Sequence, residues 1–173
     1  MRPLILVCIM AVCVPVGAAF GNGQQPAAPN DTAVRAFIQQ VEREWPGQAA
    51  QQALTVESLR LLGDAVESLA SPQQKSAQEF MTVFARFRTE TRRFESGTPD
   101  DIAQSANLQH AFITGVDLMR RLVGAKAEME PAKTRLAALR RSADGIDRKQ
   151  PLRRQPDVIE RFFHQAAELL GNL

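Results

Sequence analysis

Two histidines and two of the methionines are the side chains in this sequence with the most familiar cofactor chemistry. One histidine and one methionine could hold a b-type haem between helices, because imidazole and thioether are adequate axial ligands. Both methionines also fall on apolar stripes, where core packing explains them, so we expect no bound cofactor and rank haem binding last among the possible functions. The candidates for such a site are Met81, Met119, His110 and His164.

Other catalytic and metal-binding patterns are missing from the sequence. A c-type haem site needs a cysteine pair followed by histidine, and the two cysteines, Cys8 and Cys13, lie at the start of the chain. A di-iron bundle needs Glu-x-x-His on two helices, whereas Asn107 and Arg161 stand three residues before the histidines. There is no tyrosine, nucleophile-elbow serine or glycine-rich phosphate loop. We therefore predict a protein that is not an enzyme and has no metal site.

Two acidic pairs have structural explanations. Asp100 and Asp101 stand in the first turn of a predicted helix, where they complement the exposed backbone amides. Glu160 and His164 are four residues apart, which is the spacing of an ordinary surface pair on a helix. Neither pair indicates acid/base catalysis.

The most unusual chemical feature is a basic segment between residues 133 and 154. It contains eight basic residues against Asp144 and Asp147, whereas residues 31–70 contain six acids and three arginines. One interpretation is an interaction patch for anionic lipid head groups, surface polysaccharide or an acidic protein. The other is a solvated helix end whose charge balances the acidic helices. The basic residues of this possible patch are Lys133, Arg135, Arg140, Arg141, Arg148, Lys149, Arg153 and Arg154.

The first 19 residues have the order of a secretory signal peptide. Arg2 supplies a positive charge, residues 4–16 are apolar apart from Pro15, and residues 17–19 are small, as at a cleavage site. An uncleaved membrane anchor is the alternative, but the apolar stretch is shorter than the about 20 residues that a spanning helix needs. We expect export to a periplasm or to the outside, with no transmembrane segment after cleavage.

A single domain is expected after the signal peptide. The chain has 173 residues, of which 45% are apolar and 23% charged, as in one globular domain. Residues 20–30 are rich in Gly, Pro and Gln and predict a flexible leader, which leaves 31–173 as the domain. The net charge of +2 does not fit a strongly basic nucleic-acid binder. No aromatic residue is interleaved among the basic residues, so we expect no nucleic-acid partner.

Apolar residues recur at steps of three and four through most of this domain, which is the helical period. The spacing predicts helices over 32–45, where Trp45 precedes Pro46, and over 48–70. Ser71 and Gln74 have capping-box spacing around Pro72, and so short a joint predicts an antiparallel helical hairpin. The third helix carries an apolar seam of Ala77, Phe80, Phe84, Phe87, Thr91 and Phe94.

The second half of the domain is also predicted to be helical. A fourth helix begins near residue 99, has Ile102 as the first residue of its stripe and continues past Gly124 toward Ser142, with Pro131 expected to kink or break it. A last helix covers residues 156–171, with an apolar stripe of Ile159, Phe162, Phe163, Ala166 and Leu170. No segment shows the two-residue alternation of a β-strand more clearly than the helical period. We predict an all-α, up-and-down helical bundle of four main helices plus one or two shorter helices.

Two functions fit these observations. The first is a non-enzymatic binding protein that presents a charged face to a protein or to an anionic envelope component. The second is a lipid or hydrophobic-ligand carrier, whose amphipathic helices open onto lipid. Lipid-surface helices favour abundant lysine beside the apolar edge, whereas this chain uses Arg, Gln and Ser. We therefore favour the binding protein.

Overall fold

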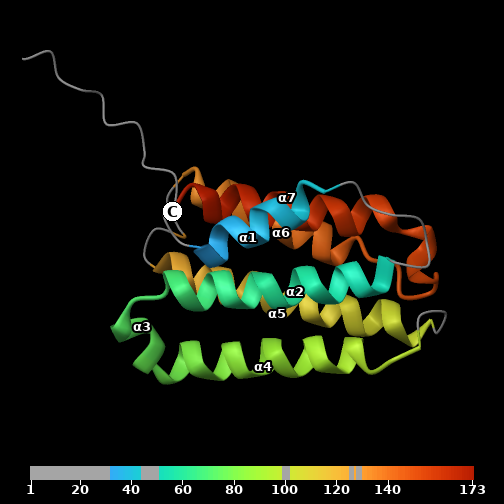
Figure 1. Cartoon of the computed structure of the whole chain (residues 1–173), viewed down its shortest axis with the longest axis horizontal. Helices are drawn as coiled ribbons and strands as arrows, with labels where there is room; N and C mark the ends of the chain where they lie inside the picture. The colour runs from blue at the N-terminus through green and yellow to red at the C-terminus, as the bar shows by residue number, and fades with distance from the viewer. Residues whose placement is uncertain (1–31, 44–50, 99–101, 125–126, 128–129) are drawn as a thin grey trace, which may run out of the picture.

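The computed structural model of the chain describes residues 32–43, 51–98, 102–124, 127 and 130–173 (Figure 1). The predicted signal peptide and leader, Trp45 and Pro99 lie outside these ranges. In the described part of the chain the regular structure is helical, which confirms the predicted all-α bundle. Its α-helices are α1 (Thr32–Val41), α2 (Gln51–Leu69), α3 (Pro72–Ser76), α4 (Gln78–Glu95), α5 (Ala103–Val123), α6 (Ala132–Asp144) and α7 (Pro156–Gly171), and a 3₁₀ turn, η2 (Leu152–Arg154), precedes α7.

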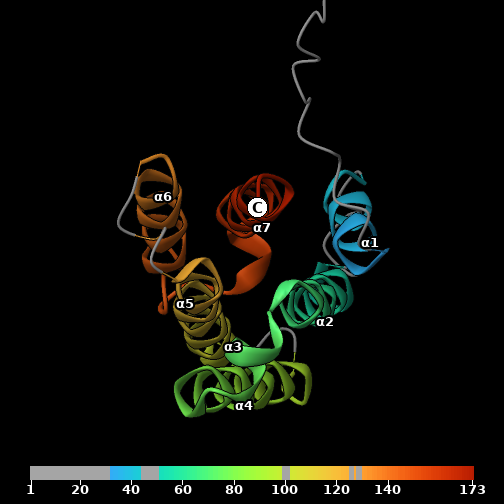
Figure 2. The ribbon, with the colours of Figure 1, turned by 90° about the vertical axis from the view of Figure 1, so that its left-hand side faces the viewer.

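The long helices run alternately in opposite directions along one axis (Figure 1). Seen end-on, α4 lies beneath α2 and α5, and α7 lies between α6 and α1 (Figure 2). α7 packs on α1, α2 and α6, which makes it a central helix of the assembly. The α6–α7 connection lies at the same end of the bundle as the first turns of α2 and α5 (Figure 1).

A cluster of aromatic rings joins three of these helices. Phe112 on α5 stacks on Phe162 on α7, with ring centroids 3.7 Å apart. Phe163 meets Phe112 edge-on at 5.4 Å and also reaches Phe37 on α1 at 6.4 Å. All four rings are fully buried. Aromatic pairs of this kind add about 0.5–1.5 kcal/mol beyond the burial of their area, so the predicted apolar stripe of the last helix forms the centre of the core.

Phe87 anchors α4 to the helices above it. A Cβ atom added to Gly63 on α2 would lie 3.3 Å from this ring, and one added to Gly115 on α5 would lie 3.2 Å from it. Both distances are shorter than ordinary van der Waals contact. The two glycines therefore leave the space that the Phe87 ring occupies between α2 and α5.

The joint after α2 contains its predicted cap but also a helix of its own. The Gln74 backbone N–H donates to the Ser71 hydroxyl, and the Ser71 backbone N–H donates to the Gln74 side chain. This confirmed capping box starts the five-residue α3 rather than the long α4. The Gln74 amide also donates to the Leu122 carbonyl at 2.7 Å, where α5 ends. One side chain therefore satisfies orphan backbone groups at two helix ends.

The predicted seam of the third helix is correct except at its start. Phe80, Phe87, Thr91 and Phe94 are buried, and Phe84 is half-buried. Ala77 is exposed, because it lies in extended backbone between α3 and α4. Helical spacing alone could not show that the chain leaves the helix at this residue.

The predicted long fourth helix is two helices. α5 begins at Ala103, four residues after the predicted start, and Ile102 is 53% exposed instead of part of the buried stripe. Gly124 has φ of +60°, a conformation that favours glycine, and α5 ends before it. α6 starts directly after Pro131. The predicted continuation past Gly124 is therefore wrong: the helix already ends at Val123, and Pro131 instead precedes the first residue of the next helix.

Helix α1 ends at Val41, four residues before the predicted end. Helix α2 is described from Gln51, and its predicted start at residue 48 lies outside the described residues. The last helix has its predicted bounds. None of the helices in the described ranges is both long enough and apolar enough to cross a bilayer.

Candidate functional site

The four residues considered for haem binding are not arranged around an interior site. Met119 is fully buried, as core packing predicts, whereas Met81 is 51% exposed, so the core explanation is wrong for Met81. His110 and His164 are both exposed, and His164 lies 3.4 Å from Glu160, the pair expected from their spacing. An axial pair across the bundle interior needs both ligands to point inward. The positions of the two histidines do not meet that requirement.

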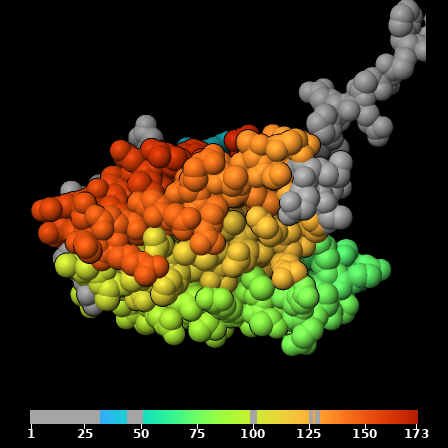
Figure 3. All heavy atoms as spheres, turned by 180° about the vertical axis from the view of Figure 1, so that it is seen from behind, coloured from blue at the N-terminus to red at the C-terminus, as the bar shows by residue number. Residues whose placement is uncertain are grey.

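The basic segment divides into two groups in space. Lys133 and Arg135 lie in the first turn of α6. Arg141 lies eight residues after Lys133, so about 12 Å separates them along the helix axis at 1.5 Å per residue. The other six basic residues lie in the last turns of α6 and in the connection from α6 to α7. Figure 3 shows α6 and this connection at the surface of the molecule. We call this group the basic surface; it consists of Arg140, Arg141, Arg148, Lys149, Arg153 and Arg154.

Ion pairs neutralise one residue of each group. Arg135 pairs with Glu168 on α7 at 3.2 Å, and Arg140 pairs with Asp144 one turn along α6 at 3.0 Å. Lys149 and Arg154 are exposed and form no side-chain ion pair within the described ranges. The basic surface therefore keeps unneutralised cations that face solvent.

Buried amide groups hold the connection beneath the basic surface. Gln155 is 7% exposed, and its side-chain oxygen accepts from the Asp147 backbone N–H at 2.7 Å. Its Nε2 donates to the backbone carbonyls of Asp147 at 2.9 Å and Gln150 at 3.0 Å. One glutamine thus closes the connection into a compact loop, because it satisfies three backbone groups of that loop.

Helix α5 attaches the same loop to the core through Gln109. The Gln109 amide donates to the Ile146 carbonyl at 3.1 Å, and its oxygen accepts from the Nε of Arg148. Arg148 is thereby held by a neutral partner and keeps its full charge.

The acid within the loop interacts mainly with the loop itself. The Asp147 carboxylate accepts from the Lys149 backbone N–H and from the Gln150 amide, each at 2.9 Å. These hydrogen bonds order the backbone of the loop that carries Arg148, Lys149, Arg153 and Arg154.

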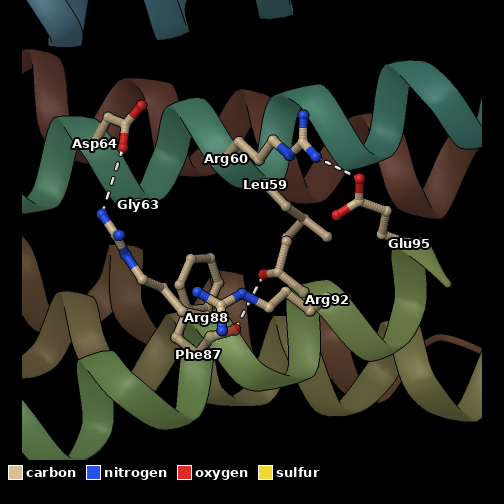
Figure 4. A pocket seen from close by; sticks show the side chains of 9 residues that line it. Leu59, Arg60, Gly63, Asp64, Phe87, Arg88, Arg92 and Glu95 are labelled. Atoms are coloured by element: carbon tan, nitrogen blue, oxygen red, sulfur yellow. Dashed lines mark hydrogen bonds and ion pairs between the residues drawn. The ribbon is translucent and has the colours of Figure 1, made fainter.

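A groove between α2 and α4 is a second recess, and sequence reasoning did not anticipate it. It has a volume of about 260 Å³ and an apolar floor that includes Leu59 and Phe87. Figure 4 shows ion pairs that cross it from α4 to α2: Arg88 reaches Asp64 at 3.7 Å, and Glu95 accepts from Arg60. Exposed pairs of this kind contribute about 0–1 kcal/mol each. Because these charges compensate one another across the groove, we assign it to helix packing.

Two parts of the candidate site were not visible in the sequence. Gln109 and Gln155 are polar residues at buried positions, and no hydrophobic period marks such positions. Arg161 on α7 lines a recess together with Arg141 on α6, although they are 20 residues apart in the chain. Only the antiparallel packing of α6 on α7 brings these two arginines together.

Comparisons of this chain with protein-family models, with curated proteins and with solved structures found no match.

Proposed function

We propose that this protein is exported and acts as a non-enzymatic binding protein, which uses the basic surface to recognise an anionic component of the cell envelope. The observation that carries the proposal is the scaffold of buried amides beneath the cations. A solvated loop needs no such scaffold, since long cationic side chains are equally well hydrated on a mobile segment. A loop whose backbone is already ordered has less ordering cost when an anion binds.

Export rests on the signal-peptide pattern of residues 1–19. Expression of the precursor with a C-terminal tag, followed by fractionation and mass spectrometry, tests this part. The expected product lacks about the first 19 residues, as the small-residue cleavage pattern implies, and is found outside the cytoplasm. A full-length product inside the cell would contradict export.

The binding part is tested by flotation of the mature chain, residues 20–173, with phosphatidylcholine vesicles that contain or lack phosphatidylglycerol. We expect binding only to the anionic vesicles, and we expect it to fall as salt is raised, because salt screens exposed charges. In the double variant Lys149→Glu/Arg154→Glu, binding should fall by at least about tenfold, since juxtamembrane cations contribute about 1 kcal/mol each and the variant also adds repulsion.

A matched control is the double variant Lys75→Glu/Arg86→Glu on α3 and α4. These residues are exposed and form no ion pair within the described ranges. This variant changes the net charge by the same amount away from the basic surface. Equal loss of binding in both double variants, or no binding by the unmodified chain, would contradict the proposed function.

A further inference from the structure

A small polar recess lies at the base of the basic surface, between α6 and α7. Its volume is about 230 Å³, several times the share of about 30 Å³ that one water has in the liquid. Arg141, Ser142 and Gly145 line it from the α6 side, and Arg161 and Gln165 line it from α7; two apolar side chains complete it. Among these described lining residues none is acidic.

Two arginines, Arg141 and Arg161, therefore line one recess whose described lining holds no carboxylate. Arg141 and Arg161 form no ion pair within the described ranges. Neighbouring acids have other partners: Asp144 pairs with Arg140 at 3.0 Å, and Glu160 pairs with His164 at 3.4 Å. Asp157, one turn before Arg161, is outside ion-pair distance of it. Like charges that share a site disfavour one another unless an anion joins them.

A third donor in the recess is held in position by its neighbour. The Ser142 hydroxyl donates to the Gln165 Oε1 at 2.8 Å, and Ser142 is itself 5% exposed. This bond uses the amide oxygen as an acceptor. It leaves the Gln165 Nε2, which has no hydrogen-bond acceptor within the described ranges, available as a donor.

We propose that this recess binds a phosphomonoester group, with Arg141, Arg161 and Gln165 as its donors. A carboxylate carries one negative charge, and a single arginine can bind both of its oxygens. The recess offers two arginines and an amide, which is more positive charge and more hydrogen-bond donors than a carboxylate needs. A phosphomonoester carries a charge of about −1.5 to −2 at pH 7 and three acceptor oxygens, which match two cations and three donor groups. The inference rests on the proposed function and deepens it, because it names the chemical group on the anionic partner.

The test uses the mature chain, residues 20–173, and measures dissociation constants for inorganic phosphate and for glycerol 3-phosphate by NMR titration. We expect both to bind, and Arg161→Gln to weaken glycerol 3-phosphate by at least about tenfold, since a hydrogen bond to a charged group is worth about 1.5–3 kcal/mol. Arg86→Gln on exposed α4 is the matched control and should leave binding unchanged. Absence of binding, or equal loss in both variants, would overturn the inference.

Vesicles distinguish a lipid source of the phosphomonoester from a soluble one. Phosphatidic acid presents a phosphomonoester, whereas phosphatidylglycerol presents a phosphodiester. At matched vesicle charge, preference for phosphatidic acid that Arg161→Gln abolishes would support a lipid headgroup, and binding of glycerol 3-phosphate without that preference would support a soluble ligand.

The two proposals fail in different ways. If Lys149→Glu/Arg154→Glu reduces vesicle binding while neither phosphate nor glycerol 3-phosphate binds the chain, the basic surface stands and the phosphomonoester recess is wrong. If glycerol 3-phosphate binds in an Arg161-dependent manner while no anionic vesicle binds, the phosphomonoester site in the recess is supported. The proposal that the basic surface recognises the envelope is then wrong.

Discussion

Gln155 is the residue on which the geometry of the basic surface depends most. Its side-chain amide forms hydrogen bonds with the backbone of Asp147 and Gln150 in the α6–α7 connection. The side chain is almost fully buried. Buried polar groups that lose their partners cost about 1–3 kcal/mol each. A single side chain thus couples the stability of the bundle to the conformation of a loop that carries cations.

Replacement of this residue should lower the stability of the protein. In Gln155→Ala we expect the free energy of unfolding to fall by about 2–4 kcal/mol, because an N–H and two carbonyls of the loop lose their partner. Urea unfolding followed by circular dichroism measures this change. The control Gln150→Ala removes one exposed hydrogen bond to Asp147 and should cost about 0.5 kcal/mol. Equal effects of the two substitutions would mean that the amide scaffold is unimportant.

At the scale of the elements, the phenylalanines of the α4 seam differ in how deeply they are buried. Phe87 is 1% exposed and fits between Gly63 and Gly115, whereas Phe84, one turn earlier, is only half-buried. The Arg88 guanidinium covers the Phe84 ring at 4.7 Å from its centroid, on the outside of the bundle. The four-phenylalanine pattern therefore hides a large difference in burial.

The same truncation at the two positions should reveal this difference. Phe87→Ala is expected to lower the free energy of unfolding by about 3–5 kcal/mol, the usual cost of deleting a buried ring. Phe84→Ala is expected to cost about 1–2 kcal/mol, because part of that ring is already hydrated and the free energy of burial scales with the apolar area removed from water. Chemical denaturation of both variants gives the comparison, and similar losses would show that α4 does not pack as described.

Sequence reasoning predicted the elements better than their joints. The stripe of the last helix and the capping box at Ser71 follow from local rules, and both are present. The exposed position of Ala77 does not follow from such rules, because helical spacing continues through the extended backbone between α3 and α4. The basic segment could be identified from its number of basic residues. Its division into two groups could not, because that depends on where α6 begins and ends.

At the scale of the whole molecule, up-and-down packing places the cations and their scaffold at one end of the bundle. α5 supplies Gln109, the α6–α7 connection supplies most of the basic surface, and α7 supplies Arg161. The aromatic cluster packs α1, α5 and α7 against one another. A binding protein of this design keeps its core closed, whereas a lipid carrier must open it.

Hydrogen exchange of the mature chain, measured free and bound to phosphatidylglycerol vesicles, tests that distinction most directly. If the basic surface binds the anion, amides of residues 145–155 should exchange more slowly in the bound state, while those of α5 and α7 keep the rates of the free protein. Faster exchange throughout α5 and α7 on the vesicle, or no change in residues 145–155, would contradict recognition by a closed bundle.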